Sequence, residues 1–253
     1  MYKILFIIFI LFLFTHLLNY YLTLKVGVIL GKQDQYLEYA KCNKDKFIGD
    51  IISGKIANTG KDAIFMAGSP GAGKTEVASG LSDRYSNYVV IDADYFRAQF
   101  PEYNGKNSSI FQKASSWLVD QAFKYVLENN YSFILDATFT ILSAEKNIIR
   151  ALKKDFQVTI FYVYQDPTVA WQFTKEREMH EGRYVPKSTF IHAFFKSREN
   201  IEKIKERHPS VELHIIIKDY QNNISETHYA ADNVNLVLPL QYTIQELEEH
   251  LYD

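Results

Sequence analysis

The strongest constraint on the fold is the segment at residues 68–75, which reads Gly68, Ser69, Pro70, Gly71, Ala72, Gly73, Lys74 and Thr75. It fits the phosphate-binding pattern G-x-x-x-x-G-K-[ST] at every fixed position. Its glycines lack Cβ atoms, so the backbone can adopt left-handed angles and approach a ligand, while its N–H groups can cradle phosphate oxygens. We expect Lys74 to reach the β- and γ-phosphates of a nucleoside triphosphate and the Thr75 hydroxyl to ligate Mg²⁺.

The residues on either side of this segment support a strand–loop–helix unit. Residues 63–67 form an apolar run of strand length directly upstream. Downstream, Val77, Ala78 and Leu81 are apolar at helical spacing. The loop therefore leads into a helix N-terminus, whose dipole favours anions. The alternative, a chance glycine-rich turn, does not account for this context.

From residue 62 onward, strand-like and helix-like segments alternate, which predicts an α/β fold with a parallel sheet. We expect a P-loop NTPase or kinase fold with about five strands covered by helices. The expected strands are residues 63–67, 88–91, 132–135, 157–164 and 212–218, and the expected helices are residues 74–85, 108–129, 143–154, 168–180 and 186–207. Residues 34–52 suit an amphipathic helix, residues 234–240 suit a further strand, and a capping box at Thr243 and Glu246 opens a terminal helix.

The N-terminus carries a second strong signal. No charged residue occurs between Ile4 and Leu24, a length that can span roughly 30 Å of hydrocarbon as a helix. Lysines are more frequent after this segment than before it, which favours a single-pass anchor at the cytoplasmic face of the cell membrane. A cleaved signal peptide and a start codon assigned too far upstream are the alternatives. The chain then divides into a hydrophobic segment at residues 1–27, a helical linker at 28–60 and a kinase domain at 61–253.

Composition excludes several classes of function. The chain of 253 residues has a net charge of −2, so no bulk charge argues for nucleic-acid binding, and none is expected. Cys42 is the only cysteine, which excludes a disulfide framework or a cysteine-based zinc site within the chain.

Carboxylates follow two of the expected strands. Asp92 and Asp94 come directly after residues 88–91, and Asp136 ends the apolar run of residues 132–135. Ligands of open parallel sheets bind at the carboxyl ends of strands, so these residues are expected near Lys74. We predict that Asp94 accepts a proton from a substrate hydroxyl and that Asp92 helps to hold the metal. The alternative for both is helix N-capping.

Two arginines lie further along the chain. Arg177 and Arg183 flank a charged stretch that contains Gly182, where the backbone can change direction sharply. Arginine suits phosphate binding because its guanidinium forms paired hydrogen bonds, and it stabilises transition-state charge in phosphoryl transfer. The alternative is an ordinary charged helix end in solvent.

Taken together, four blocks of sequence resemble the zeta toxin family of P-loop kinases. They are GSPGAGKT at residues 68–75, IDADYFR with FPEY at 91–97 and 100–103, LDATFT at 135–140, and Arg177 with GRYVP at 182–186. The resemblance implies a kinase that uses ATP and Mg²⁺ to phosphorylate the sugar 3′-hydroxyl of UDP-N-acetylglucosamine. It also implies a small antitoxin protein as a partner.

The resemblance assigns roles to individual residues. Lys74 and Thr75 would hold phosphate and metal, Asp94 would be the general base, and Arg177 and Arg183 would clamp phosphate. The substrate-contacting positions are matched by Asp120, Asp136 and Thr138. Asp120 and Asp136 stand where better-known members carry glutamate, and Thr140 stands where such members can have arginine. The resemblance is therefore closer for the ATP half of the site than for the sugar half.

Other functions share part of this pattern. Another small-molecule or nucleotide kinase of the same fold would share the loop and Asp94. A switch GTPase is disfavoured because Asn43-Lys44-Asp45-Lys46 lies upstream of the loop and ends in lysine. An AAA+ ATPase is disfavoured because Ala137, rather than glutamate, follows Asp136. A membrane-tethered regulatory NTP-binding protein with a vestigial site is the remaining alternative.

Overall fold

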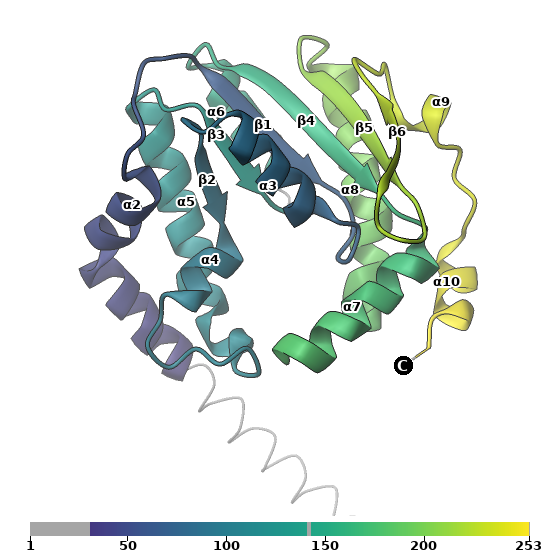
Figure 1. The fold of residues 1–253 in the computed structure, drawn as a ribbon, viewed down its shortest axis with the longest axis horizontal. Coiled ribbons are helices and arrows are strands. Elements are labelled where there is room, and N and C mark those ends of the chain that lie inside the picture. Colours follow the sequence, from purple (N-terminus) through teal and green to yellow (C-terminus); the bar gives the residue numbers. More distant parts are fainter. Residues whose placement is uncertain (1–30, 141–142, 253) are drawn as a thin grey trace, which may run out of the picture.

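The computed structural model describes residues 31–140 and 143–252 of the chain. Its centre is a six-stranded sheet in the order β2-β3-β1-β4-β5-β6 (Figure 1). Strands β1 to β5 are parallel, and β6 runs antiparallel to β5 at one edge. The strands are β1 Asp62–Ala67, β2 Val89–Asp92, β3 Phe133–Asp136, β4 Gln157–Tyr164, β5 Glu212–Lys218 and β6 Ile224–His228. The predicted α/β class with a parallel, helix-covered sheet is confirmed.

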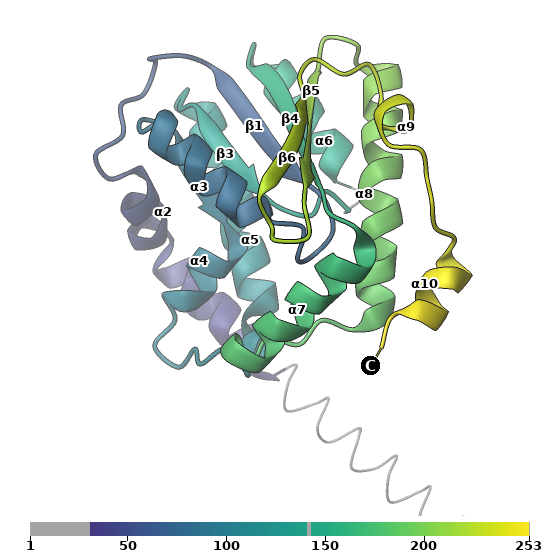
Figure 2. The same cartoon turned by 45° about the vertical axis from the view of Figure 1, so that its right-hand side comes forward.

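Helices cover both faces of the sheet. The helical elements are α2 Lys44–Ile52, α3 Lys74–Arg84, α4 Ala93–Ala98, η1 Ser108–Phe111, α5 Gln112–Glu128, α6 Ala144–Leu152, α7 Pro167–Glu181, α8 Lys187–Arg207, α9 Val234–Val237 and α10 Ile244–His250. Alternate residues of β1 point to opposite faces, as the pleat of a strand requires. Phe65 joins the core beneath α5, α6 and α8, whereas Ile64 and Met66 join the smaller core beneath α3 (Figures 1 and 2).

The strands are apolar because both faces of the sheet are covered. Phe65, Phe123 and Phe133 are almost fully buried and form a mutual edge-to-face cluster, with ring centroids 5.4 to 6.1 Å apart. The register then places Asp92 of β2 opposite Asp136 of β3 at the carboxyl edge of the sheet. Packing of the apolar residues therefore determines where these two carboxylates meet.

The helices that precede β1 pack into the same core. Residues 31–42 are helical, and the ring of Tyr36 packs edge-to-face with Phe100 and at a tilt with Phe111, with ring centroids 5.8 and 4.3 Å away. Phe47 of α2 packs on Phe96 and Phe100, at 6.2 and 5.3 Å. The predicted boundary between a linker at 28–60 and a kinase domain at 61–253 stays a prediction, but residues 31–52 share a core with α4 and α5.

Two short elements differ from the expectation. Residues 234–240 were expected to extend the sheet, but the sixth strand is β6, and Val234–Val237 is the short helix α9. A carboxylate oxygen of Glu202 on α8 accepts the N–H of Val234 at 2.6 Å, so a distant residue holds this helix start. The capping box at Thr243 is present, and it opens α10 as predicted.

The expected membrane anchor must be corrected. In residues 31–140 and 143–252, no helix is both long and apolar enough to cross a bilayer. The longest, α8, has 21 residues but carries many charged side chains. The expected span at residues 4–24 lies outside the described residues. The predicted location at the cytoplasmic face of the membrane is therefore not supported.

Truncation of Phe47 tests whether residues 31–52 are part of the folded core. Phe47 is 4% exposed, so Phe47→Ala should lower the free energy of unfolding by about 3–5 kcal/mol through lost burial and a residual cavity. Urea denaturation followed by circular dichroism measures this. Ile56→Ala is the control, because Ile56 is 65% exposed and should change stability by less than about 0.5 kcal/mol. Equal effects of the two substitutions would contradict a shared core.

Candidate active site

The phosphate-binding loop joins β1 to α3 and requires its glycines. Gly68, Gly71 and Gly73 have φ angles of 137°, 72° and 86°, which disfavour residues with a Cβ atom. A Cβ atom on Gly71 would lie 2.0 Å from the carbonyl oxygen of Ala170 in α7. A Cβ on Gly68 would lie 2.3 Å from the carbonyl oxygen of Val163 in β4. The glycines therefore let the loop pack directly against its neighbours.

Lys74 closes the loop on itself. Its Nζ donates a hydrogen bond of 2.8 Å to the carbonyl oxygen of Ser69. Burial lowers the pKa of Lys74 to about 8, although the negative charge of Asp136 opposes this shift. An ammonium in this position is poorly compensated without a bound anion, which suits a phosphate site.

Asp136 pairs with the metal-ligand candidate Thr75. The Thr75 hydroxyl donates to Oδ2 of Asp136 at 3.0 Å. Burial raises the pKa of Asp136, and Lys74 partly offsets that effect. A hydroxyl beside a carboxylate is a donor set that fits Mg²⁺ bound to phosphates. Asp136, predicted as a substrate contact, thus lies where a metal ligand is also expected.

Asp92 acts as an N-cap in the described structure. Its two carboxylate oxygens accept the N–H groups of Asp94 and Tyr95 at 2.9 and 3.3 Å, which starts α4. Burial raises the pKa of Asp92 to about 6. Within residues 31–140 and 143–252, no group of three or more His, Cys, Asp or Glu side chains can hold a metal ion. The assignment of Asp92 as a metal ligand stays a prediction.

Asp94 lies at the centre of an arginine cluster. Arg183 donates to Oδ2 of Asp94, and Arg177 of α7 approaches the same oxygen at 3.5 Å. Gly182, with a φ of 73°, ends α7 and turns the chain so that Arg183 reaches back to the site. The structure therefore brings Asp94 together with two arginines that lie more than eighty positions later in the sequence.

Arg97 is a site residue that the sequence reasoning did not assign. It is 4% exposed and donates to Oδ1 of Asp94 and to the side-chain oxygen of Gln112. Burial lowers its pKa, and the charge of Asp94 opposes this. The signal in the sequence was the spacing of three between Asp94 and Arg97, which places both on one face of a helix.

The remaining candidates fall into two groups. Thr138 lies at the loop, since its carbonyl oxygen accepts the N–H of Gly68 at 3.4 Å and its hydroxyl pairs with Thr140 at 3.0 Å. Asp120 instead points to Arg150 of α6, 3.1 Å away, with its side chain 58% exposed. In the described part of the chain, no hydrogen bond or ion pair joins Asp120 to the loop or to Asp94. Its substrate role stays a prediction.

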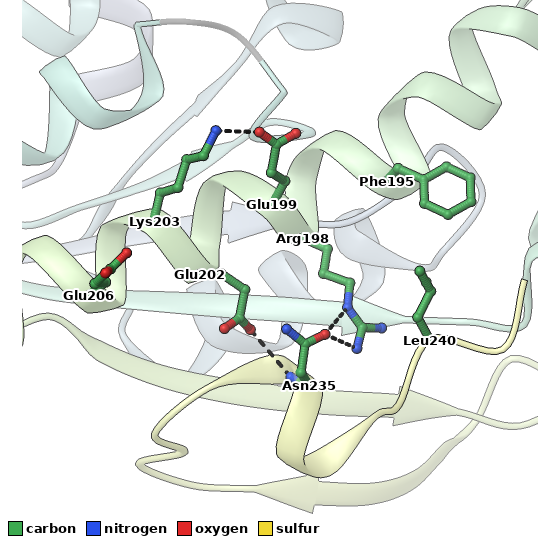
Figure 3. Close-up of a pocket in the computed structure, with 8 residues that line it drawn as sticks. All are labelled: Phe195, Arg198, Glu199, Glu202, Lys203, Glu206, Asn235 and Leu240. Carbon is green, nitrogen blue, oxygen red and sulfur yellow. Dashed lines mark hydrogen bonds and ion pairs between the residues drawn. The ribbon is translucent and has the colours of Figure 1, made fainter. Parts of the chain in front are cut away.

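A pocket elsewhere does not compete with this site. It encloses about 580 Å³ between α8 and the segment that holds α9 (Figure 3). Most of its polar side chains already pair with one another: Arg198 donates to Asn235 at 2.9 and 2.6 Å, and Lys203 pairs with Glu199. The loop edge, by contrast, gathers a phosphate cradle, carboxylates and arginines.

Substitution of Gly71 should disrupt the loop. Gly71→Ala forces a Cβ atom towards Ala170 at a left-handed φ, so we expect at least about 2 kcal/mol of destabilisation and weaker ATP binding. Calorimetric titration with ATP and urea denaturation measure the two effects. Gly80→Ala is the control, because no atom lies within 4 Å of the added carbon and alanine favours the helix by roughly 0.5–1 kcal/mol. Unchanged ATP affinity in Gly71→Ala would contradict the close-packing argument.

Lys74 should lower the stability of the folded protein while supporting ATP binding. Its folded-state pKa of about 8 lies below the ordinary 10.5, so the stability cost is fully present below pH 8 and disappears as pH rises towards 10.5. Lys74→Met should therefore be more stable than wild type at pH 7 by on the order of 1–2 kcal/mol, with a smaller difference at pH 10, and should lose ATP binding. Lys46→Met, at an exposed lysine, should show neither effect. Urea denaturation at both pH values measures the difference, and a less stable Lys74→Met at pH 7 would overturn this interpretation.

Comparisons with known proteins identify relatives of this chain in sequence and in fold. The toxin PezT of Streptococcus pneumoniae serotype 4 is 26% identical over 144 residues, which are 53% of this chain and 56% of that protein. The chain thus matches little more than half the length of that relative. The solved structure of the PezAT chromosomal toxin–antitoxin system has a similar fold, with a TM-score of 0.58 and 17% identity over 84% of this chain and 86% of that one.

A second solved structure extends the likeness in fold. The AvrRxo1-ORF1:AvrRxo1-ORF2 structure with sulphate ions has a TM-score of 0.56 and 12% identity, covering 88% of this chain and 80% of that one. The zeta toxin family model matches residues 50–230, which include the loop, all three aspartates of the sheet edge and both arginines. This match covers more than half of the chain, which therefore belongs to the zeta toxin family.

Proposed function

We propose that this protein transfers the γ-phosphoryl group of ATP to a hydroxyl of a nucleotide sugar such as UDP-N-acetylglucosamine. The observation that carries the proposal is the meeting of Asp94, Arg177 and Arg183 at the sheet edge that also holds Lys74 and Asp136. A nucleotide-binding loop alone supports NTP binding. A carboxylate held beside two arginines adds a base and two phosphate ligands, which phosphoryl transfer needs.

The contacts suggest the order in which these residues act during the reaction. Lys74 and the loop N–H groups hold the β- and γ-phosphates, and Thr75 and Asp136 are placed to hold Mg²⁺, which neutralises phosphate charge when bound. Arg177 and Arg183 exchange Asp94 for the γ-phosphate. The carboxylate of Asp94 is then free to accept the proton of the acceptor hydroxyl. The hydroxyl oxygen forms the new bond to phosphorus, the bond to the bridging oxygen breaks, and ADP leaves.

The acceptor is the less constrained half of the proposal. Thr138 and Asp136 lie at the loop edge, where they can contact a nucleotide sugar. Asp120, however, pairs with Arg150 away from the other residues. This contact favours a second candidate, a kinase of the same family that phosphorylates a different small-molecule hydroxyl.

We also propose an antitoxin partner. Support comes from the family and from two similar structures, the PezAT toxin–antitoxin system and the AvrRxo1-ORF1:AvrRxo1-ORF2 structure, each of which names a second protein. A small protein that binds this chain and stops ATP turnover would be the expected partner. Co-expression with the neighbouring reading frame, followed by co-purification and an activity assay, tests this.

Removal of the proposed base gives the sharpest activity test. Asp94→Asn should lower kcat about 10²- to 10⁴-fold because it removes the proton acceptor, while Kd for ATP should stay within a few-fold. Transfer of labelled γ-phosphate to UDP-N-acetylglucosamine, with stopped reactions separated by chromatography, measures kcat. Asp83→Asn, at an exposed residue of α3, is the matched control. Full turnover in Asp94→Asn would exclude Asp94 as the base.

A panel of acceptors separates the two candidates. Nucleotide sugars, nucleosides and simple sugar acids are compared at equal concentration, and the phosphorylated position is identified by NMR. The first candidate predicts the highest kcat/KM for UDP-N-acetylglucosamine, with phosphate on the 3′-hydroxyl. A preferred acceptor without a uridine diphosphate group would support the second.

A further inference from the structure

A second lysine reaches the phosphate-binding loop from the end of β5, just before the turn between β5 and β6. Lys218 ends β5, is only 8% exposed, and lies beside the last glycine of the loop. A Cβ atom built on Gly73 would meet Lys218 Cε at 3.1 Å and Nζ at 3.4 Å, and the side-chain oxygen of Asn222 at 2.7 Å. Both views show this turn next to the loop that follows β1 (Figures 1 and 2). Two side chains therefore converge on one point of the loop.

The polar groups of these two side chains lack partners. The ammonium of Lys218 makes no hydrogen bond or ion pair with any residue in the described part of the chain, and Asp219 interacts with it only at longer range. The side-chain oxygen of Asn222 is buried and accepts no hydrogen bond from residues 31–140 or 143–252. Buried polar groups in folded proteins are normally paired, so the buried, unpaired oxygen of Asn222 next to the ammonium of Lys218 points to a ligand site.

The turn holds Asn222 in position. Asn222 has a φ of 64°, in the left-handed region, and its N–H donates to the carbonyl oxygen of Asp219 at 2.9 Å. The Asp219 carboxylate accepts the N–H groups of Gln221 and Asn223 at 2.9 and 2.8 Å. These bonds fix the turn, so the side chain of Asn222 is presented to the loop by an ordered backbone.

The order of the strands says which end of a nucleotide would lie here. Asp94 follows β2 and Asp136 ends β3, on one flank of β1, and they mark where the γ-phosphate reacts. Lys218 ends β5, on the other flank. A triphosphate that reaches Asp94 with its γ-phosphate must extend its nucleoside end away from β2 and β3.

We propose that the β5–β6 turn forms the nucleoside-side wall of the donor site, where Lys218 binds the α- or β-phosphate and Asn222 accepts a hydrogen bond from the nucleoside. This rests on the proposed use of ATP. Gly73 is required at its position because these two side chains and the ligand share the space that a Cβ atom would fill. The donor nucleotide is thus held between two lysines, Lys74 of the loop and Lys218 at the end of β5.

The experiment measures nucleotide binding without any acceptor, so it does not depend on catalysis. ATP, ADP and inorganic tripolyphosphate are titrated calorimetrically into wild type, Lys218→Met, Lys218→Gln and Lys218→Arg. We expect both neutral variants to bind all three probes at least about tenfold more weakly, because a charge-assisted bond is lost. Lys218→Arg should stay within about threefold of wild type, since it keeps the charge. Lys124→Met, at an exposed lysine of α5, is the matched control.

The role of Asn222 has its own readout. Asn222→Gly keeps the left-handed backbone and removes the acceptor, so it should weaken ATP and ADP binding but leave tripolyphosphate binding unchanged. Asn222→Asp keeps an acceptor oxygen, so it should retain more ATP affinity than Asn222→Gly. It also adds a negative charge, and any repulsion between this charge and phosphate is measured as weaker binding of tripolyphosphate. Urea denaturation confirms that each variant is folded.

The outcomes distinguish this inference from the proposed function. Folded Lys218→Met and Lys218→Gln that bind ATP and ADP within twofold of wild type would overturn it, and the two side chains would then only fill space behind Gly73. Weakened binding of ATP but not ADP would also overturn it, because it would place Lys218 at the γ-phosphate. If the Lys218 and Asn222 variants weaken nucleotide binding as expected but wild type transfers no phosphate, the kinase assignment is rejected. The nucleoside-side wall of the donor site then still stands.

Discussion

The site depends on the direct contact between the backbone of the phosphate-binding loop and helix α7. Gly71 has no side chain, so the loop can lie against the carbonyl oxygen of Ala170. The same helix carries Arg177 near its end and leads through Gly182 to Arg183. The spacing between the phosphate cradle and the two arginines is therefore set by close packing of backbone atoms, which is far stiffer than any contact between long side chains.

One carboxylate of the site is surrounded by several cations. Asp94 faces three guanidinium groups, from Arg97, Arg177 and Arg183. These donors contact both oxygens of the Asp94 carboxylate. In the proposed mechanism, phosphate competes for the more accessible Arg177 and Arg183 but not for buried Arg97. In this proposed mechanism, nucleotide binding and release of Asp94 are thereby coupled.

Elements with their own local signal were predictable. Strands β4 and β5 lie at the expected residues, because long apolar runs report burial directly. Short elements were not, because other parts of the chain hold them. Helix α9, for example, is capped by its own Asn233, but the N–H of Val234 at its start also donates to Glu202 of distant α8. For the same reason, Asp120 was expected at the site but pairs with Arg150. The predicted membrane anchor found no support in the described helices.

By itself, the sequence determined the phosphate-binding loop, the α/β class and the family, because each follows from local residue order and spacing. Only the tertiary structure decided which side chains share a site. It paired Asp136 with Thr75, brought Arg183 to Asp94, and placed Lys218 against Gly73. These pairs join residues on different elements. Their contacts depend on strand register and helix packing, which the whole core sets together and no short stretch of sequence encodes.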